Sequence, residues 1–131
     1  PIMKENKSGS IINISSIYGN VSPDNSLYEN TGLNSSPSYG AGKAAIIQFT
    51  KFMAGSLGKD GIRVNSVSPG AFPSEKIQKK IRFVNNLKKK IPLGRIGKPY
   101  ELKGIMVFLG SDSSNYVTGA NIMVDGGWTA W

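Results

Sequence analysis

Three short apolar runs alternate along the chain with two stretches whose apolar residues recur at helical spacing. The runs 10–15, 62–68 and 121–124 each contain Ile or Val among few charged residues, and Gly or Pro-Gly flanks each of them, which predicts buried strands. The periodic stretches predict helices over about 38–57 and 99–110. Strand, helix, strand, helix, strand is the order of a parallel sheet with crossover helices, so the pattern predicts an α/β fold.

The two predicted helices have distinct start signals and apolar faces. Ser36 and Pro37 supply an N-cap and a first-turn residue, and Pro99 opens the second helix. Gly40 and Gly42 lie inside the first helix, where glycine is costly, which indicates close approach by another segment. The expected buried faces are Ile46, Ile47, Phe49, Thr50, Met53 and Leu57 in the first helix and Leu102, Ile105, Met106, Phe108 and Leu109 in the second. The segments 19–37 and 111–120 are expected to be loops, and 71–98 to be irregular or weakly helical.

Composition removes several classes of chemistry. The chain has no Cys and no His, which excludes disulfides, thiolate or imidazole metal sites and a Ser-His-Asp triad. Acid–base chemistry would therefore use Tyr, Lys or a carboxylate, and no metal is expected. No apolar run approaches the ~18–20 residues of a membrane helix, and the first residues lack a signal-peptide core. Because the chain starts at Pro1 and an apolar run opens by Gly9, we expect a segment of a longer, cytoplasmic protein.

The positive charge is concentrated in one segment. The formal net charge is +8, but seven Lys and Arg residues lie within 76–90 without an acidic residue, and the rest of the chain is nearly neutral. Lys76, Lys79, Lys80 and Arg82 are candidates for contact with an anionic substrate, whereas a solvated helix face is favoured for Lys88–Lys90. Nucleic-acid binding is disfavoured, because no groove-reading helix or stacking aromatics accompany the charge.

Candidate reactive residues gather at one predicted edge of the sheet. Tyr39 and Lys43 are four residues apart and so share one face of a helix. A nearby ammonium favours the phenolate form of a Tyr, whose reference pKa is ~10, so such a Tyr can exchange a proton near neutral pH. Ser16 follows the first strand and Pro69-Gly70 ends the second. Ligands bind at the carboxyl ends of parallel strands, so these features are expected to converge there.

Five motifs resemble those of one enzyme family and follow that family's order along nearly the whole chain. They are Ile11-Ile12-Asn13-Ile14-Ser15-Ser16, Tyr39-x-x-x-Lys43, Ile62-Arg63-Val64-Asn65-x-Val67-x-Pro69-Gly70, Pro92-Leu93-Gly94-Arg95 with Pro99-x-Glu101, and Thr118-Gly119-x-Asn121-x-x-Val124-Asp125-Gly126-Gly127. Each motif alone is weak, but together they resemble the short-chain dehydrogenase/reductase family. The resemblance implies a Rossmann-like parallel sheet and hydride transfer between NAD or NADP and a carbonyl or secondary alcohol.

The resemblance also implies roles for individual residues. Ser16 would hydrogen-bond the substrate oxygen, Tyr39 would be the general acid/base, and Lys43 would assist Tyr39 and bind the nicotinamide ribose. The cofactor would further contact Pro69, Gly70, Ala71, Phe72 and Ser74, and the small-molecule substrate would contact Ser16, Ile17, Tyr18 and Tyr28. Asn13 and Asn65 would be structural, and the full protein would form a homotetramer or homodimer through the 38–57 helix and the last strand.

The chain departs from the family's pattern in two ways. The Gly-rich turn after the first family strand, the cofactor selector and the Asn of the catalytic tetrad are absent, so residues 1–131 are expected to be the C-terminal half of the domain, with its last three strands. The alternatives are a non-catalytic truncated fragment or a basic interaction module.

The second departure is a long connection from Ser16 to Tyr39. Residues 23–36 are expected to form a wall of the substrate pocket, the alternative being an inert surface insertion. This connection and the ending Gly127-Trp128-Thr129-Ala130-Trp131 are similar to family members linked to bacterial surface-sugar and flagellin modification, which makes an anionic sugar a candidate substrate.

Overall fold

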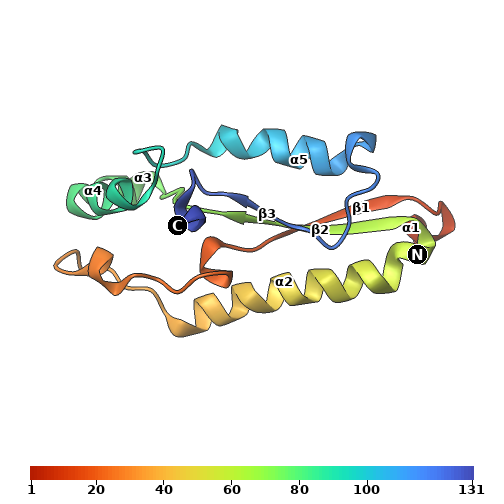
Figure 1. Ribbon diagram of the computed structural model, residues 1–131, viewed down its shortest axis with the longest axis horizontal. Helices are drawn as coiled ribbons and strands as arrows, with labels where there is room; N and C mark the ends of the chain where they lie inside the picture. The colour runs from red at the N-terminus through yellow and green to blue at the C-terminus, as the bar shows by residue number, and fades with distance from the viewer.

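Three parallel strands form the centre of the molecule, with one long helix on each face (Figure 1). The computed structural model describes all residues, 1–131. The strands β1 (Gly9–Ile14), β2 (Ile62–Pro69) and β3 (Asn121–Val124) lie in the order β1-β2-β3. All three predicted strands are confirmed to within a residue at each end.

The register brings the carboxyl ends of the strands to one edge of the sheet. Ile14 pairs with Val67, and Val67 pairs with Ile122 on the other side of β2. The helix α2 (Pro37–Leu57) covers one face, and α5 (Lys103–Gly110) covers the other (Figure 1). The α/β class with crossover helices is therefore confirmed. A short helix, α1 (Ile2–Glu5), precedes β1.

The predicted helical faces need correction. Phe49 on α2 is 55% exposed and Phe108 on α5 is 38% exposed, although both were expected in the core. A helix that lies on a sheet of only three strands buries a narrow stripe, which on α2 centres on the fully buried Thr50 and on Ala54. The second helix also begins differently, because its first turn, Pro99–Leu102, is a 3₁₀ turn.

The segment 71–98 is more ordered than the sequence indicated. It contains α3 (Glu75–Gln78) and the ten-residue α4 (Ile81–Lys90). The α4 helix buries Phe83, Val84 and Leu87 at helical spacing, and three consecutive lysines at its end obscured that pattern. Phe83 and Leu87 join a core cluster with Ile17, Leu27, Ile91 and Trp128.

The connection 19–37, predicted as loop, contains two single 3₁₀ turns, Ile17–Gly19 at its start and Asn25–Tyr28. The loop 111–120 contains a further 3₁₀ turn, Asp112–Ser114. The first connection runs from β1 to α2 and the second from α5 to β3, and the regular structure in both is limited to these short turns. None of the helices in the chain is long and apolar enough to cross a membrane.

Buried amide and hydroxyl groups tie the elements together. Asn65 on β2 is fully buried, donates from its side chain to the carbonyl of Val117 and accepts from the amide of Ala120. Asn13 on β1 donates to the hydroxyl of Thr50 on α2. Both asparagines therefore hold the sheet to its neighbours, in agreement with the structural role expected for them.

Candidate active site

A cavity of about 230 Å³ opens at the carboxyl edge of the sheet. Its wall contains eight of the residues predicted for the site: Ser16, Ile17, Tyr18, Tyr28, Tyr39, Gly70, Ala71 and Phe72. Three predicted residues lie outside the wall. Lys43 points to the end of β1, Pro69 is the last residue of β2, and Ser74 is the residue that precedes α3.

Ser16 lies immediately beyond β1 and faces the cavity. The amide of Ser15 donates to the carbonyl of Val67 at 2.8 Å, so the chain follows the strand ladder up to Ser16. The side-chain oxygen of Ser16 accepts a hydrogen bond from the amide of Tyr18 at 3.2 Å. Because the oxygen acts there as acceptor, the hydroxyl proton of Ser16 remains available to donate to a ligand.

Tyr39 and Lys43 extend from one face of α2 toward the same edge. The ammonium nitrogen of Lys43 lies 5.6 Å from the centroid of the Tyr39 ring and donates to the carbonyl of Ile14 at 3.1 Å. Ser15 donates from its hydroxyl to the carbonyl of Lys43 at 2.7 Å. The helix is thus attached to the end of β1 by both the backbone and the side chain of Lys43. The sequence analysis did not identify Ser15, whose role depends on this tertiary contact.

Gly19 allows the turn after Ser16 to lie directly against α2. A Cβ atom at position 19 would be 2.7 Å from the carbonyl carbon of Lys43 and 2.9 Å from the amide nitrogen of Ala44. A Cβ at Gly40 would in turn lie 3.0 Å from the carbonyl oxygen of Tyr18. The turn and the helix are therefore in backbone contact. The expected close approach is found at Gly40, whereas Gly42 has open space beside it.

A chain of amide side chains connects this turn to the other two strands. Asn20 donates to the carbonyl of Ser16 at 3.1 Å and to the hydroxyl of Ser68 at 3.2 Å. Asn121, the first residue of β3, donates to the side-chain oxygen of Asn20 at 2.8 Å. The position of Ser16 thus depends on β1, β2 and β3 together.

The rest of the cavity wall comes from segments that the sequence analysis left unassigned. Phe83 and Leu87 of α4 and Trp128 near the end of the chain line the cavity, together with Pro73 and Ile77. The spacing of Phe83, Val84, Leu87 and Ile91 was a signal that could have found α4. Nothing local to Trp128 indicated that it would meet the same cavity.

Two phenol groups of the wall bond to each other. The hydroxyl oxygens of Tyr18 and Tyr28 are 2.9 Å apart. Burial, followed by the hydrogen bond with Tyr28, raises the pKa of Tyr18 far above its usual range. The raised pKa favours the protonated form of Tyr18, which makes it unsuited to accept a proton during a reaction near neutral pH. This distinguishes it from Tyr39, which is 48% exposed.

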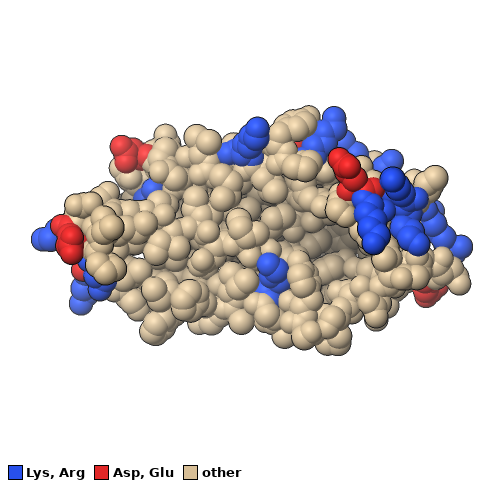
Figure 2. All heavy atoms as spheres, turned by 180° about the vertical axis from the view of Figure 1, so that it is seen from behind, with Lys and Arg blue, Asp and Glu red and all other residues tan.

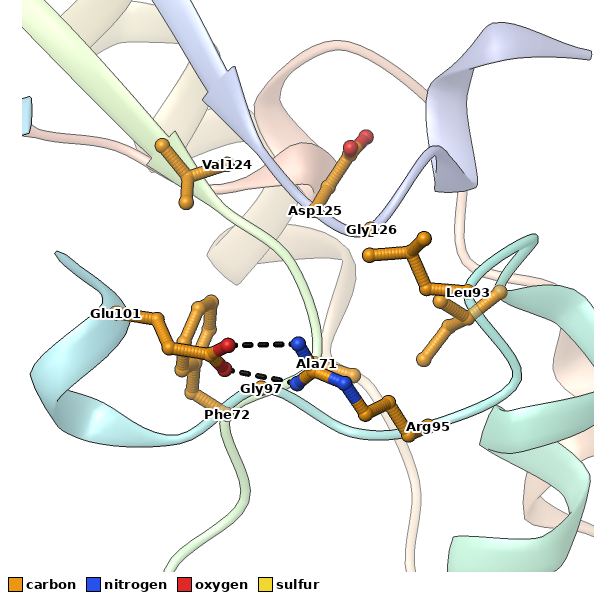
Figure 3. Close-up of a pocket in the computed structure, with 10 residues that line it drawn as sticks. Ala71, Phe72, Leu93, Arg95, Gly97, Glu101, Val124, Asp125 and Gly126 are labelled. Atoms are coloured by element: carbon orange, nitrogen blue, oxygen red, sulfur yellow. Dashed lines mark hydrogen bonds and ion pairs between the residues drawn. The ribbon is translucent and has the colours of Figure 1, made fainter.

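A second, smaller cavity of about 110 Å³, drawn in Figure 3, shares Ala71 and Phe72 with the first. Arg95 forms two contacts with the carboxylate of Glu101, at 2.8 and 2.6 Å. The amide of Gly97 donates to the carbonyl of Ala71 at 2.9 Å, and a Cβ at position 97 would overlap the ring of Phe72. This segment therefore holds the backbone after β2 in place.

The basic residues of the segment 76–90 lie outside both cavities. Lys and Arg side chains gather at the end of the molecule formed by α3 and α4 (Figure 2). Lys90 pairs with Asp24 at 2.8 Å. That ion pair joins the end of α4 to the connection 23–36.

These features define an α/β protein with its ligand site at the carboxyl edge of a parallel sheet. Ser16 offers a hydroxyl donor in the cavity wall, and the ammonium group of Lys43 lies beside the phenol ring of Tyr39. Such a set suits chemistry at an alcohol or carbonyl oxygen. The family model described as enoyl-(acyl carrier protein) reductase matches residues 1–129. The chain belongs to the short-chain dehydrogenase/reductase family.

Named relatives support this assignment. The chain is 40% identical over 129 residues to cyclohexanol dehydrogenase from a Rhodococcus species, covering 97% of this chain and 45% of the relative. It is 42% identical over 130 residues to 3-oxoacyl-(acyl-carrier-protein) reductase FabG from Thermotoga maritima, covering 97% and 48%.

A solved structure supports the same family assignment. The short chain dehydrogenase from Leptospira borgpetersenii with bound NAD+ aligns with a TM-score of 0.85 at 42% identity, over 98% of this chain and 48% of that one. The chain therefore spans just under half the length of the relatives it matches.

We expect Gly19→Ala to disrupt the site through the backbone. The added methyl group must push the turn away from Lys43 and Ala44, which displaces Ser16 relative to Tyr39. In the full-length protein, kcat should fall by about 10- to 100-fold, as misplacement by about 1 Å can cost. Gly55→Ala on α2, where nothing lies within 4 Å of an added Cβ, is the control. Unchanged kcat in Gly19→Ala would refute the close-contact requirement.

The pair Arg95–Glu101 predicts a dependence of stability on pH. The hydrogen bonds from Arg95 and from the amide of Lys98 lower the pKa of Glu101 from 4.5 to about 2. Because the folded pKa is below the unfolded one, the pair stabilises the fold above about pH 4.5 and this stabilisation is lost as the pH falls toward about 2.

The urea midpoint of the wild-type protein should therefore fall more steeply between about pH 5 and about pH 3 than that of Glu101→Gln. The difference should be modest, because the pair is exposed and screened by solvent. Glu5→Gln, which removes a carboxylate without a hydrogen bond or ion pair, should follow the wild type. Parallel curves for wild type and Glu101→Gln would contradict the assignment.

Proposed function

We propose that the full-length protein is an NAD- or NADP-dependent oxidoreductase that interconverts a secondary alcohol and a carbonyl compound. The observation that carries the proposal is that Ser16 and Tyr39 line one cavity, with Lys43 one helical turn behind Tyr39. The relatives named cyclohexanol dehydrogenase and 3-oxoacyl-(acyl-carrier-protein) reductase act on an alcohol and a carbonyl by their names, which supports the same reaction type here.

The residues of this chain fit one end of a nicotinamide dinucleotide. Tyr39 and Lys43 would hold the nicotinamide ribose, and the backbone from Pro69 to Phe72, with Ser74, would contact the ring and its carboxamide. The fit rests on the structure around these residues, since Gly70 and Phe72 face the cavity beside Tyr39 and Gly97 supports the backbone at Ala71. The bound ring would supply the hydride chemistry.

In the mechanism, the residues of this chain manage the proton and the oxygen. Ser16 donates a hydrogen bond from its hydroxyl to the substrate oxygen, keeps its proton and holds that oxygen in place. Tyr39 removes the proton of the alcohol during oxidation and returns it during reduction. A fixed donor at the substrate oxygen stabilises the negative charge that develops on this oxygen. The aromatic wall of the cavity limits the access of water.

We further propose that residues 1–131 are the C-terminal half of a domain. The full-length protein would form a homotetramer or homodimer. The matched share of each relative supports the first part. On α2, Phe52 is 68% exposed and Phe49 is 55% exposed, which supports contact of this helix with another surface. A cytoplasmic location stays a prediction, and so does the anionic sugar, which a cavity wall without a charged side chain does not favour.

The DNA upstream of the codon for Pro1 tests the half-domain assignment directly. We expect an in-frame segment that encodes a strand, a Gly-rich turn and a helix, because backbone amides at a helix N-terminus bind the pyrophosphate. A stop codon immediately upstream with a start at this segment would instead favour the non-catalytic truncated fragment.

Tyr39→Phe tests the general acid/base role that we propose for Tyr39. The substitution keeps the ring but removes the proton, so kcat for alcohol oxidation should fall by at least about 100-fold, the scale of a lost general acid/base. The change is followed by NADH or NADPH absorbance in the full-length protein. Tyr116→Phe removes a hydroxyl from a fully exposed ring and serves as the control. Turnover of Tyr39→Phe near that of the control would remove Tyr39 from the mechanism.

A further inference from the structure

The cavity wall that this chain supplies is aromatic and carries no charged side chain. Six of its residues are aromatic: Tyr18, Tyr28, Tyr39, Phe72, Phe83 and Trp128. The remaining members are aliphatic or small, apart from Ser16. A carboxylate or phosphate group on a substrate would find no cation in this wall, and the lysines and arginine of the segment 76–90 lie outside it. Burial of such an anion without a partner is costly.

Beyond Ser16 and Tyr39, the polar groups of the wall's side chains are the indole of Trp128 and the hydroxyls of Tyr18 and Tyr28. The two hydroxyl oxygens lie 2.9 Å apart, so one of the two hydroxyls donates a hydrogen bond to the other. Each phenol has one donor and two acceptor sites. The pair therefore keeps one proton to donate and several lone pairs that accept, a combination that matches a neutral hydroxyl group on a ligand.

The pair is held in position from behind. The ring of Tyr28 lies against Phe83 of α4, with centroids 5.3 Å apart. Asn86 donates to the carbonyl of Leu27 at 3.2 Å, and Lys90 pairs with Asp24 at 2.8 Å. These contacts fix the connection 23–36 on α4 before any ligand arrives. Preorganised hydroxyls lose little freedom when they bind a ligand, which makes them suitable for discrimination between substrates.

We propose that the Tyr18–Tyr28 hydroxyl pair recognises a second hydroxyl group on an uncharged substrate whose apolar body fills the aromatic cavity. The inference rests on the proposed alcohol–carbonyl chemistry and specifies its substrate class. Ser16 and Tyr39 engage the reacting oxygen, and the tyrosine pair engages the other one. The raised pKa of Tyr18, which burial and the bond to Tyr28 cause, favours the protonated pair that this recognition needs.

The test uses the full-length protein with NAD+ and with NADP+ and three kinds of probe. These are cyclohexanol, the 1,2-, 1,3- and 1,4-cyclohexanediols, and 4-hydroxycyclohexanecarboxylate. In the wild type, kcat/KM should be higher for at least one diol than for cyclohexanol and lowest for the carboxylate. In Tyr28→Phe and in Tyr18→Phe, the diol-to-cyclohexanol ratio should fall about 3- to 10-fold, the scale of one lost hydrogen bond between uncharged groups.

Two control variants separate recognition from support of the wall. Asp24→Asn weakens the ion pair with Lys90 but leaves both phenols, so it should change turnover of all alcohols alike and keep the ratio. Tyr116→Phe, on an exposed ring far from the wall, should also keep the ratio.

The outcomes distinguish this inference from the function on which it rests. An equal loss for diols and cyclohexanol in Tyr28→Phe, or a wild-type preference for cyclohexanol or the carboxylate, would overturn the inference while the oxidoreductase stands. If no probe is oxidised with either cofactor, both the proposed function and the inference fail. A diol preference that both tyrosine variants reduce supports both.

Discussion

The site depends on one backbone contact, between the turn after β1 and the helix α2. Gly19 has no room for a side chain, because the carbonyl of Lys43 and the amide of Ala44 lie where a Cβ would be. The hydrogen bond from Ser15 to the carbonyl of Lys43 closes the same contact from the strand side. Ser16, which follows a strand, and Tyr39, on a helix more than twenty residues later, therefore face one cavity. The reaction that we propose for Ser16 and Tyr39 needs this fixed geometry, since small displacements are costly for rate.

The parallel sheet determines where the contact falls. All three strands end at the same edge, and the side chains of Asn20, Ser68 and Asn121 connect those ends. The backbone after β2 is supported by Gly97, whose segment is in turn held by the pair Arg95–Glu101. The strand ends are thus attached to one another, and the backbone after β2 is attached to the segment around Gly97. The result is a rigid inner side of the cavity, built from strand ends.

The outer side of the cavity is built differently. It combines Tyr28 from the connection 23–36, Phe83 and Leu87 from α4, and Trp128 from the end of the chain. These segments pack mainly on one another, and an ion pair and a tyrosine pair join them. The residues to which we assign proton transfer therefore lie at the sheet edge and on the adjoining helix α2, and the groups that we propose to select the substrate lie on loops and a short helix. This division allows substrate choice to change without disturbance of Ser16, Tyr39 and Lys43.

The sequence by itself determined the features that depend on local periodicity. The three strands follow from short apolar runs flanked by Gly or Pro, and the long helix and the shared face of Tyr39 and Lys43 follow from spacings of three to four residues, which the helical backbone imposes. Family motifs added the family and expected roles for Ser16 and the residues after Pro69. The α4 helix was missed because its lysines diluted a short apolar pattern, although that pattern is local and was readable.

Tertiary structure alone decided which distant segments meet. The buried face of α2 is centred on Thr50 and leaves Phe49 exposed, because a sheet of three strands covers only a narrow stripe of the helix. The bond between Tyr18 and Tyr28, the anchoring role of Ser15 and the place of Trp128 in the cavity each require the chain to fold back on itself. No local pattern encodes such contacts, since their energy comes from burial and hydrogen bonding between segments that are remote in the chain.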